Sequence, residues 1–437
     1  MISLLGLLAA LTLLIVLTMR GMNLFIATPL CALLVALSGG IAPLPLPDST
    51  APNMVGLYMS GFTSFIASWF FMFLLGSIFG KVMEDTGCAD SIVQSVAGRL
   101  GVKHAALAVV LACAVLTYGG VSLFVVAFSV YPMAVGLFRQ ADLPRRFIPA
   151  ALSFGSVTFT MTSAGSPEIQ NWIPIDYLGT NQYAGWQASI VVALFMAVFG
   201  YWWLRWMIQR AVRRGERFDA RDNDPVPTRK SLPNPLAALL PLVAVLGISF
   251  ALHERFETAA LIVALLAGAV TAAIVGWQHQ QKPGQALADA ATGALIAIGN
   301  TAAVVGFGAV AKAAPAFQDA VTWVTHLPGG GLVGAAIAVS LIAAMTGSAS
   351  GGQAIALPII SPIYLGQGVS PDQLHRVVAI SSGVLDSLPH NGYVVTTIRA
   401  ICQETHARAY PSVGAMTVIV PLLGLVLCIA LFALGLS

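Results

Sequence analysis

Apolar runs long enough to cross a lipid bilayer recur along the whole of this 437-residue chain. A membrane-spanning helix needs about 20 apolar residues to cross roughly 30 Å of hydrocarbon. Ten segments reach or approach that length: residues 2–19, 22–41, 62–82, 147–171, 187–208, 236–252, 257–278, 290–312, 374–398 and 413–435. Only 9% of the residues are charged, whereas soluble proteins average about 25%. The sequence therefore predicts an all-α polytopic membrane protein, which excludes a water-soluble enzyme and a disordered chain.

Two further apolar stretches, residues 105–137 and 332–366, are each interrupted near the middle. The first is broken at Tyr118-Gly119-Gly120, and the second is broken between Thr346 and Gly352. Each half is too short to cross the bilayer, and Gly supplies the backbone freedom that a tight turn needs. Irregular backbone at membrane depth is tolerated only where it is buried in protein or lines a cavity. Both stretches are predicted to be re-entrant helical hairpins.

Lysine and arginine are unevenly distributed between the two sides that this layout creates. Alternate threading places 18 of the 21 basic residues in the cytoplasm, at Arg20, 81–104, 139–146, 205–230, Lys282 and 399–408. Arg255, Lys312 and Arg376 fall on the opposite face. This asymmetry follows the positive-inside rule, so the clustered charge indicates orientation and not a nucleic-acid partner. Residues 1–19 lack the basic region of a signal peptide, and we expect a multi-pass protein with both termini outside.

A basic, Pro-rich linker over residues 210–235 divides the chain into two halves, 1–209 and 236–437. Each half contains three spans, a broken hairpin, an interrupted span and a last span. The interruptions are Thr160–Glu168 in span 147–171 and Leu385–Gly392 in span 374–398. Each half has an odd number of crossings, so the second is predicted to be inverted. Paired interrupted segments are typical of a transporter site near the midplane, although single Gly or Pro kinks are common in membrane helices.

The second interruption also carries a resemblance to a known family. Asp386-Ser387-Leu388-Pro389-His390-Asn391-Gly392, followed by Thr405-His406 and a terminal span, resembles the gluconate:proton symporter family of the ion transporter superfamily. The segment from Gly76 to Gly87 is similar to the same family. The resemblance implies proton-coupled uptake of gluconate, related sugar acids or 3-hydroxybutyrate. It also implies a homodimer in a bacterial inner membrane, in which a mobile transport domain moves against a static scaffold (about 2–82 and 236–300).

One departure from the family pattern bears on the substrate. Gluconate-type members carry an acidic residue in the first hairpin tip, where this chain has Tyr118-Gly119-Gly120-Val121-Ser122. This favours a shorter hydroxy acid such as 3-hydroxybutyrate.

The amphipathic segment 89–101 is expected to be an interfacial helix that links the scaffold and the transport domain.

The four breaks are predicted to bind the substrate carboxylate through backbone N–H groups. Helix N-termini present unpaired N–H groups and about half a positive charge, and no Lys or Arg lies in the breaks. Serine hydroxyls assist, while Asn391 and Thr162 are candidate partners for substrate hydroxyls. The predicted substrate-binding residues are Tyr118, Gly119, Gly120, Ser122, Thr162, Ser163, Gly165, Ser166, Thr346, Ser348, Ser350, Gly351 and Asn391.

Three ionisable residues inside the interrupted spans are candidates for carrying the coupling proton: Glu168, Asp386 and His390. Ionisable groups within the membrane are rare and usually functional. The alternative is structural, with Asp386 capping a broken helix and His390 donating to a carbonyl. Sodium coupling stays open, because unwound carbonyls also coordinate Na⁺.

Other functions are less compatible with these patterns. The five cysteines form no metal-binding spacing and are interpreted as packing residues, so no metal and no cofactor are expected. The sequence contains neither the HExxH nor the GxSxG motif of an intramembrane enzyme, and isolated catalytic residues would not predict two inverted halves. A passive anion channel stays an alternative, which saturable uptake against a gradient would exclude. Lys81, Glu84 and Asp85 are interpreted as an ion pair or cap at the end of a span.

Overall fold

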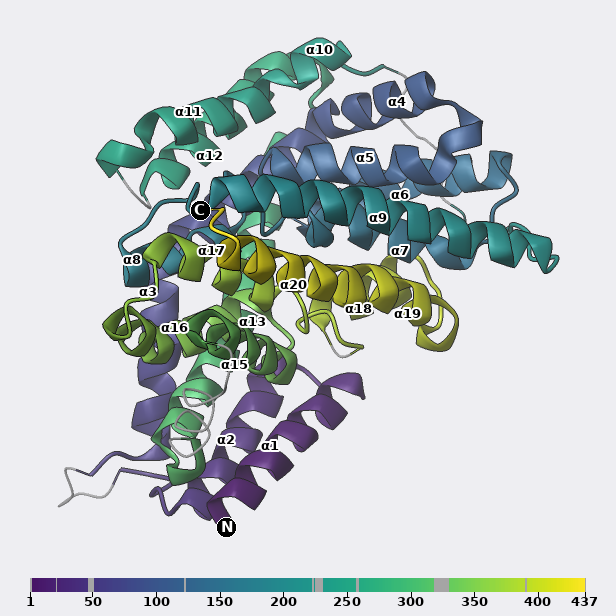
Figure 1. The fold of residues 1–437 in the computed structure, drawn as a ribbon. Coiled ribbons are helices and arrows are strands. Elements are labelled where there is room, and N and C mark those ends of the chain that lie inside the picture. The colour runs from purple at the N-terminus through teal and green to yellow at the C-terminus, as the bar shows by residue number, and fades with distance from the viewer. Residues whose placement is uncertain are drawn as a thin grey trace.

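The computed structural model describes residues 2–20, 22–45, 51–121, 123–221, 224, 231–256, 259–317, 330–389 and 391–436. Helices joined by short loops make up this part of the chain, and no β-strand is found within it (Figure 1). The expected all-α membrane architecture is confirmed.

Six helices, three from each half of the sequence, form one packed group. The long helices α3 and α13 lie against each other, α2 and α12 flank them, and α1 and α11 pack on α2 and α12. Figure 1 shows α1 and α2 side by side at the bottom of the view. Their bounds are α1 Ile2–Met19, α2 Leu24–Gly39, α3 Met54–Asp85, α11 Leu240–Phe256, α12 Ala259–Val275 and α13 Pro283–Ala313.

The remaining helices form a second group that contains all four breaks. α5 packs against α6, α15 against α16, and α9 against α20. In the first half the bounds are α4 Cys88–Leu100, α5 Ala105–Tyr118, α6 Leu123–Gln140, α7 Ile148–Ser153, α8 Ile173–Leu178 and α9 Trp186–Arg213. After the short α10 (Pro235–Ala238), the second half has α15 Gly330–Thr346, α16 Ala349–Gly366, α17 Pro371–Ser382, α18 Gly392–Val395, α19 His406–Gly414 and α20 Val420–Ala433.

Helix length and apolarity identify five clear membrane spans among the described residues. They are Met54–Asp85, Trp186–Arg213, Pro235–Leu252, Pro283–Ala313 and His406–Ala433. α4 and α5 meet at 106° and would add a sixth if they form one broken span. Ile2–Leu17, Leu24–Gly39 and Ala259–Val275 are apolar but shorter.

Two of the ten predicted spans are not continuous helices, because each stops at its Gly- and Ser-rich interruption. The first runs through α7 and a π-helical turn, Phe154–Thr158, and then becomes irregular up to Ile169. The second consists of α17, an irregular segment, and α18 continued by a π-helical turn, Thr396–Ile401. That the two halves are repeats related by inversion across a membrane stays a prediction.

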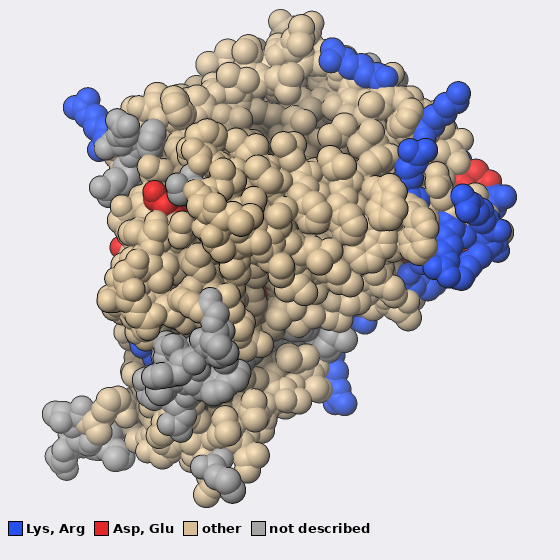
Figure 2. Space-filling view, in the orientation of Figure 1, with Lys and Arg blue, Asp and Glu red and all other residues tan. Residues whose placement is uncertain are grey.

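The start of the linker between the halves, residues 216–221 and 224, crosses one end of the molecule where charged residues gather. We call this segment the linker strap. Five ion pairs among the described residues fix it: Arg139–Asp224, Arg145–Asp224, Arg146–Glu216, Arg217–Asp142 and Arg221–Glu404. Lys and Arg gather at this end in Figure 2, where Figure 1 places the end of α9 beside α7 and α19. The start of the linker is thus attached to the group that contains the breaks and not to the six-helix group.

Candidate transport site

A cavity of about 670 Å³ lies between the six-helix group and the four breaks. Its wall on one side consists of residues from α3 and α13, together with Leu261 and Leu265 of α12. The opposite wall contains residues from every break: Gly120, Pro167, Glu168, Gly347, Ser348, Ser350, Asp386 and Asn391. Segments that are more than 200 residues apart in sequence therefore border one chamber.

The N-terminus of α16 forms part of this wall. The Ser348 side chain caps the helix by accepting a hydrogen bond from the Gly351 amide at 3.1 Å. Ala349 and Ser350 follow the cap and line the cavity. Amides in the first turn of a helix have no carbonyl partner within that helix, and the helix dipole makes this end attractive to anions. α16 therefore presents to the cavity a helix end whose dipole and first-turn amides suit an anion.

Two glycines determine the structure of the second hairpin tip, one by its turn and the other by the close helix contact that it allows. Gly347 adopts a left-handed conformation, with φ +60°, between α15 and α16. At Gly352 a Cβ atom would lie 2.8 Å from the Ala343 Cα atom of α15. Only a residue without a side chain allows the two helices to approach this closely just behind the cap.

Asn391 joins the second hairpin to the second interrupted span. Its Nδ2 atom donates to the Gly347 carbonyl at 2.9 Å, and its Oδ1 atom accepts from the Val394 amide at 2.9 Å. One side chain thus fixes the hairpin tip and caps the helix that begins at Gly392. Each end of the amide makes one of its two hydrogen bonds in this way, so Asn391 shapes the cavity, and its contact with a substrate hydroxyl stays a prediction.

Two carboxylic acids face the cavity from the two interrupted spans. Glu168 follows Pro167 at the end of the first irregular segment, and Asp386 is 7% exposed within the second. The Ser387 hydroxyl donates to Asp386 Oδ1 at 2.9 Å. Among the described residues, neither carboxyl group has an ion-pair partner. Within the described part of the chain, a change in the proton occupancy of either group would therefore break no salt bridge.

Several predicted binding residues of the first half lie behind the cavity wall and hold the break together. The Tyr118 hydroxyl donates to the Ala164 carbonyl at 2.7 Å. The Ser163 hydroxyl donates to Phe159 O, and the Gly165 amide donates to Gln182 O. The carbonyls of Thr162 and Ser166 also accept hydrogen bonds from neighbouring side chains.

The remaining predicted residues fall into two sets. Gly119 faces Leu242, and Gly351 is held by the Ser348 cap, so neither lines the cavity. Ser122 and His390 lie outside the described residues, as does the side chain of Thr346, which ends α15. The structure therefore places six of the predicted residues in the wall: Gly120, Glu168, Ser348, Ser350, Asp386 and Asn391.

Arg376 is the main residue of this region that the sequence did not indicate. Charge counting assigned it to the external face, but in the structure it is fully buried in α17 and contacts the first break. Asn171, also fully buried, accepts a hydrogen bond from Arg376 and donates to the carbonyls of Ser163 and Ser166 at 2.7 and 3.2 Å. The only signal in the sequence was a lone charge beside the apolar run Val377-Val378-Ala379-Ile380.

Further polar groups in the wall come from residues that sequence patterns did not single out. Gln170 lines the cavity, and its buried Oε1 atom has no hydrogen-bond partner among the described residues. Asn300 and Thr301 of α13 face the same space. The fully buried Gln353 donates to Gln170 O at 2.9 Å and to the Ser382 hydroxyl at 3.1 Å. Gln353 thereby ties α16 to both interrupted spans.

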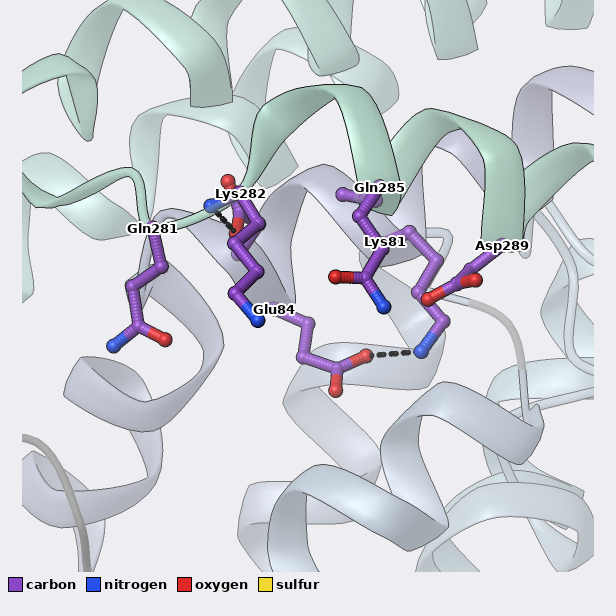
Figure 3. Close-up of a pocket in the computed structure, with 8 residues that line it drawn as sticks. Lys81, Glu84, Gln281, Lys282, Gln285 and Asp289 are labelled. Atoms are coloured by element: carbon purple, nitrogen blue, oxygen red, sulfur yellow. Dashed lines mark hydrogen bonds and ion pairs between the residues drawn. The ribbon is translucent and has the colours of Figure 1, made fainter.

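Charged residues surround the end of the cavity near α3 and the start of α13. Lys81 and Asp289 line the cavity and also a smaller pocket of about 170 Å³ beside it. Figure 3 shows Lys81 reaching toward Glu84, to which it is paired at 2.8 Å. The ion pair expected at the end of this span is therefore present. Asp85 accepts a hydrogen bond from the Lys282 amide at 2.9 Å, which joins the ends of α3 and α13.

All five cysteines are buried and none is in a disulfide, in agreement with a packing role. No cluster of three or more His, Cys, Asp or Glu side chains suited to a metal ion occurs in the described part of the chain.

Comparisons with known proteins assign the chain to a group of transporters. No family model matches the sequence. The uncharacterized transporter YxjC of Bacillus subtilis is 34% identical over 457 residues, covering 94% of this chain and 95% of YxjC. An uncharacterized transporter of Haemophilus influenzae is 26% identical over 346 residues, covering 77% of this chain and 78% of that protein.

A solved structure shares the fold. The crystal structure of the YdaH transporter from Alcanivorax borkumensis, described as having an unusual topology, aligns with a TM-score of 0.57. The alignment covers 94% of this chain and 98% of that one at 18% identity, so the likeness concerns the fold alone. The extent and level of identity with YxjC are decisive for the family. The chain is a multi-pass membrane protein that belongs to the YxjC family of transporters.

Proposed function

We propose that this transporter imports a small organic acid anion by proton symport. The proposed substrate is a hydroxy monocarboxylate such as 3-hydroxybutyrate or gluconate, the classes implied by the resemblance to the gluconate:proton symporter family. One observation carries the proposal: the cavity is bordered both by the capped N-terminus of α16 and by two carboxylic acids that lack a basic partner among the described residues.

The anion is expected to bind at the start of α16. A carboxylate entering the cavity loses hydration, and the first-turn amides together with the hydroxyls of Ser348 and Ser350 replace that water. Helix-terminal amides hold an anion without the strong, bidentate contact of an arginine, which suits release. Gln170 and Asn300 lie in the same wall and are suited to a substrate hydroxyl.

Proton coupling follows from the charges in the cavity. A charge inside the membrane costs about 2.5–3.5 kcal/mol even on the lenient insertion scale. A substrate carboxylate beside Glu168 or Asp386 would add a second negative charge to the same enclosed space. Taking up a proton with the anion keeps the loaded site close to neutral, so the two are transported together.

Alternating access is proposed to occur by an elevator-type movement. The cavity lies between the continuous helices α3 and α13 and the group that contains the breaks. Displacement of the second group along α3 and α13 would carry the site across the membrane while the six-helix group stays in place. The cavity reaches Lys81 and Asp289, at the end assigned to the cytoplasm by charge, which corresponds to an inward-facing state. We propose that the six-helix group also forms the contact of a homodimer.

Uptake by proteoliposomes tests this function. Labelled 3-hydroxybutyrate or gluconate should accumulate against its gradient when the lumen is alkaline, and unlabelled hydroxy acids in a competition panel should rank by affinity. Glu168→Gln and Asp386→Asn should each abolish proton-driven accumulation but retain substrate counterflow, which needs no net proton movement. Glu84→Gln, whose side chain lies outside the cavity, is the matched control and should retain both. Unchanged accumulation in both cavity variants would disprove the coupling, and flux that neither saturates nor accumulates substrate would indicate a passive channel.

A further inference from the structure

The guanidinium group of Arg376 is held by a cage of neutral oxygen atoms behind the first break. Its Nη1 atom donates to Thr162 O at 2.6 Å and to Asn171 Oδ1 at 2.8 Å. Its Nη2 atom donates to Ala184 O at 2.8 Å and to Gln182 O at 3.3 Å, and its Nε atom donates to Ala184 O at 3.0 Å. The residue is 0% exposed.

No carboxylate of the described residues forms an ion pair with this buried charge, although Asp372, one turn earlier in α17, interacts with it electrostatically. Among the ion pairs of the described residues, none includes Arg376. Arginine does not deprotonate in proteins, so a full positive charge stays at this position. Three backbone carbonyls and one amide oxygen surround it. Hard cations receive the same kind of oxygen shell where transporter helices unwind.

The first break has almost no carbonyl group left to offer to another cation. Between residues 159 and 166, six of the eight carbonyls already accept a hydrogen bond. Their donors are the Ser163 hydroxyl and amide, Arg376, Asn171, Tyr118 and Trp172. Buried polar groups normally have hydrogen-bond partners. Most carbonyl groups of the first break already have theirs, so few remain to coordinate a metal ion.

We infer that Arg376 is a built-in cation, which occupies in the first break the position that a coupling sodium ion would otherwise take. The fixed guanidinium stabilises the unwound backbone and supplies a permanent positive charge behind the wall that contains Glu168. Transport is therefore independent of Na⁺, and the mobile coupling charge is carried by the cavity carboxyl groups. This inference deepens the proposed function and rests on it for the identity of the coupling ion.

Chemical rescue of Arg376→Ala tests the inference without requiring a known substrate. The variant leaves four oxygen acceptors facing a buried space, so the purified protein should melt at a lower temperature than the wild type. Millimolar guanidinium chloride should restore at least half of the lost melting temperature, and NaCl should restore part of it. Urea, which has the same shape without the charge, and choline chloride should restore none. Arg205→Ala, at an exposed position of α9, is the matched control and should respond to no additive.

Two further measurements keep the inference testable if Arg376→Ala does not fold. Wild-type melting temperature should be equal in NaCl and choline chloride, and Arg376→Lys should fold and keep this indifference to Na⁺. A rise of the wild-type melting temperature with NaCl, or equal rescue by urea and guanidinium, would overturn the built-in cation. Absence of hydroxy acid uptake would instead disprove the proposed function and leave these melting data interpretable.

Discussion

At the scale of single residues, Asn391 does more than its place in a motif suggests. It spans 44 residues of sequence to reach the Gly347 carbonyl and also caps the helix that begins at Gly392. Asn391→Ala removes both hydrogen bonds in a buried setting, and we expect it to lower the free energy of unfolding by roughly 2 kcal/mol. Thermal unfolding in detergent measures this loss, and substrate affinity should fall with it because the wall of the cavity loosens.

Asn53→Ala provides the matched control for Asn391. Asn53 also caps a helix, accepting from the Gly56 amide at 2.8 Å, but this contact is exposed and, among the described residues, its side chain joins no second element. Its removal should cost only about 1 kcal/mol and leave substrate affinity unchanged. Equal losses in the two variants would show that Asn391 acts as an ordinary cap and not as a bridge between breaks.

At the scale of elements, the second hairpin depends on close contact between α15 and α16. Gly352→Ala would place a methyl group 2.8 Å from the Ala343 Cα atom, and overpacking of this kind costs about 1–3 kcal/mol. Gly366→Ala, at the other end of α16, meets no atom within 4 Å and should instead gain about 0.5–1 kcal/mol from helix propensity. Melting temperatures that move in opposite directions would verify the contact, whereas a shift of the same sign would refute it.

The breaks were predictable because their cause is local. Gly, Ser and Pro interrupt the apolar runs at Gly119, Gly165, Gly347 and Gly392, and each interruption ends a helix in the structure or begins the next. The helix expected over 89–101 is found as α4 for the same reason, since Gly101, with φ +69°, ends it. Span lengths were less predictable, because hydropathy does not show where a helix stops within an apolar run.

The contacts inside the breaks could not be read from the sequence because they join distant residues. Arg376 reaches Thr162 across 214 positions, and Gln353 reaches Gln170 across 183. No spacing rule links such pairs. For the same reason, the sequence does not show that the hydroxyl groups of Tyr118 and Ser163 donate to backbone carbonyls, and their contact with a substrate stays a prediction.

At the scale of the whole molecule, the linker strap should make stability depend on pH. Burial of Asp224 acts to raise its pKa, but hydrogen bonds from Arg145, the Arg221 amide and Arg139 outweigh this, and the pKa lies below its ordinary value. Hydrogen bonds from Arg146 likewise lower the pKa of Glu216. A carboxyl group with a lowered pKa in the folded state stabilises the protein above its unfolded pKa, near pH 4, and this contribution is lost as the pH falls through the folded pKa.

Asp224→Asn measures the contribution of the strap. The substitution leaves Arg145, only 2% exposed, without its carboxylate, and should cost about 3 kcal/mol at pH 7. The difference in melting temperature from the wild type should shrink as the pH falls from about 4 through the lowered pKa of Asp224, where the carboxyl group becomes protonated. Asp219→Asn, at an exposed position of the same linker, should show no such difference. A gap that stays constant down to pH 3 would be inconsistent with a stabilising charge on Asp224.

The proposed movement makes the interface between the two helix groups the place where transport can be stopped. Gly308 of α13 lies against Ile355 of α16, across that interface, whereas Gly61 of α3 lies against Ala309 of α13, within the six-helix group. In a background with the five native cysteines replaced by alanine, oxidation of a Gly308→Cys/Ile355→Cys pair should abolish uptake, and reduction should restore it. Oxidation of a Gly61→Cys/Ala309→Cys pair should leave uptake intact, because those helices do not move relative to each other. Full uptake by the oxidised cross-group pair would exclude an elevator movement along α13, since a site that crosses the membrane with α16 must break this contact in every cycle.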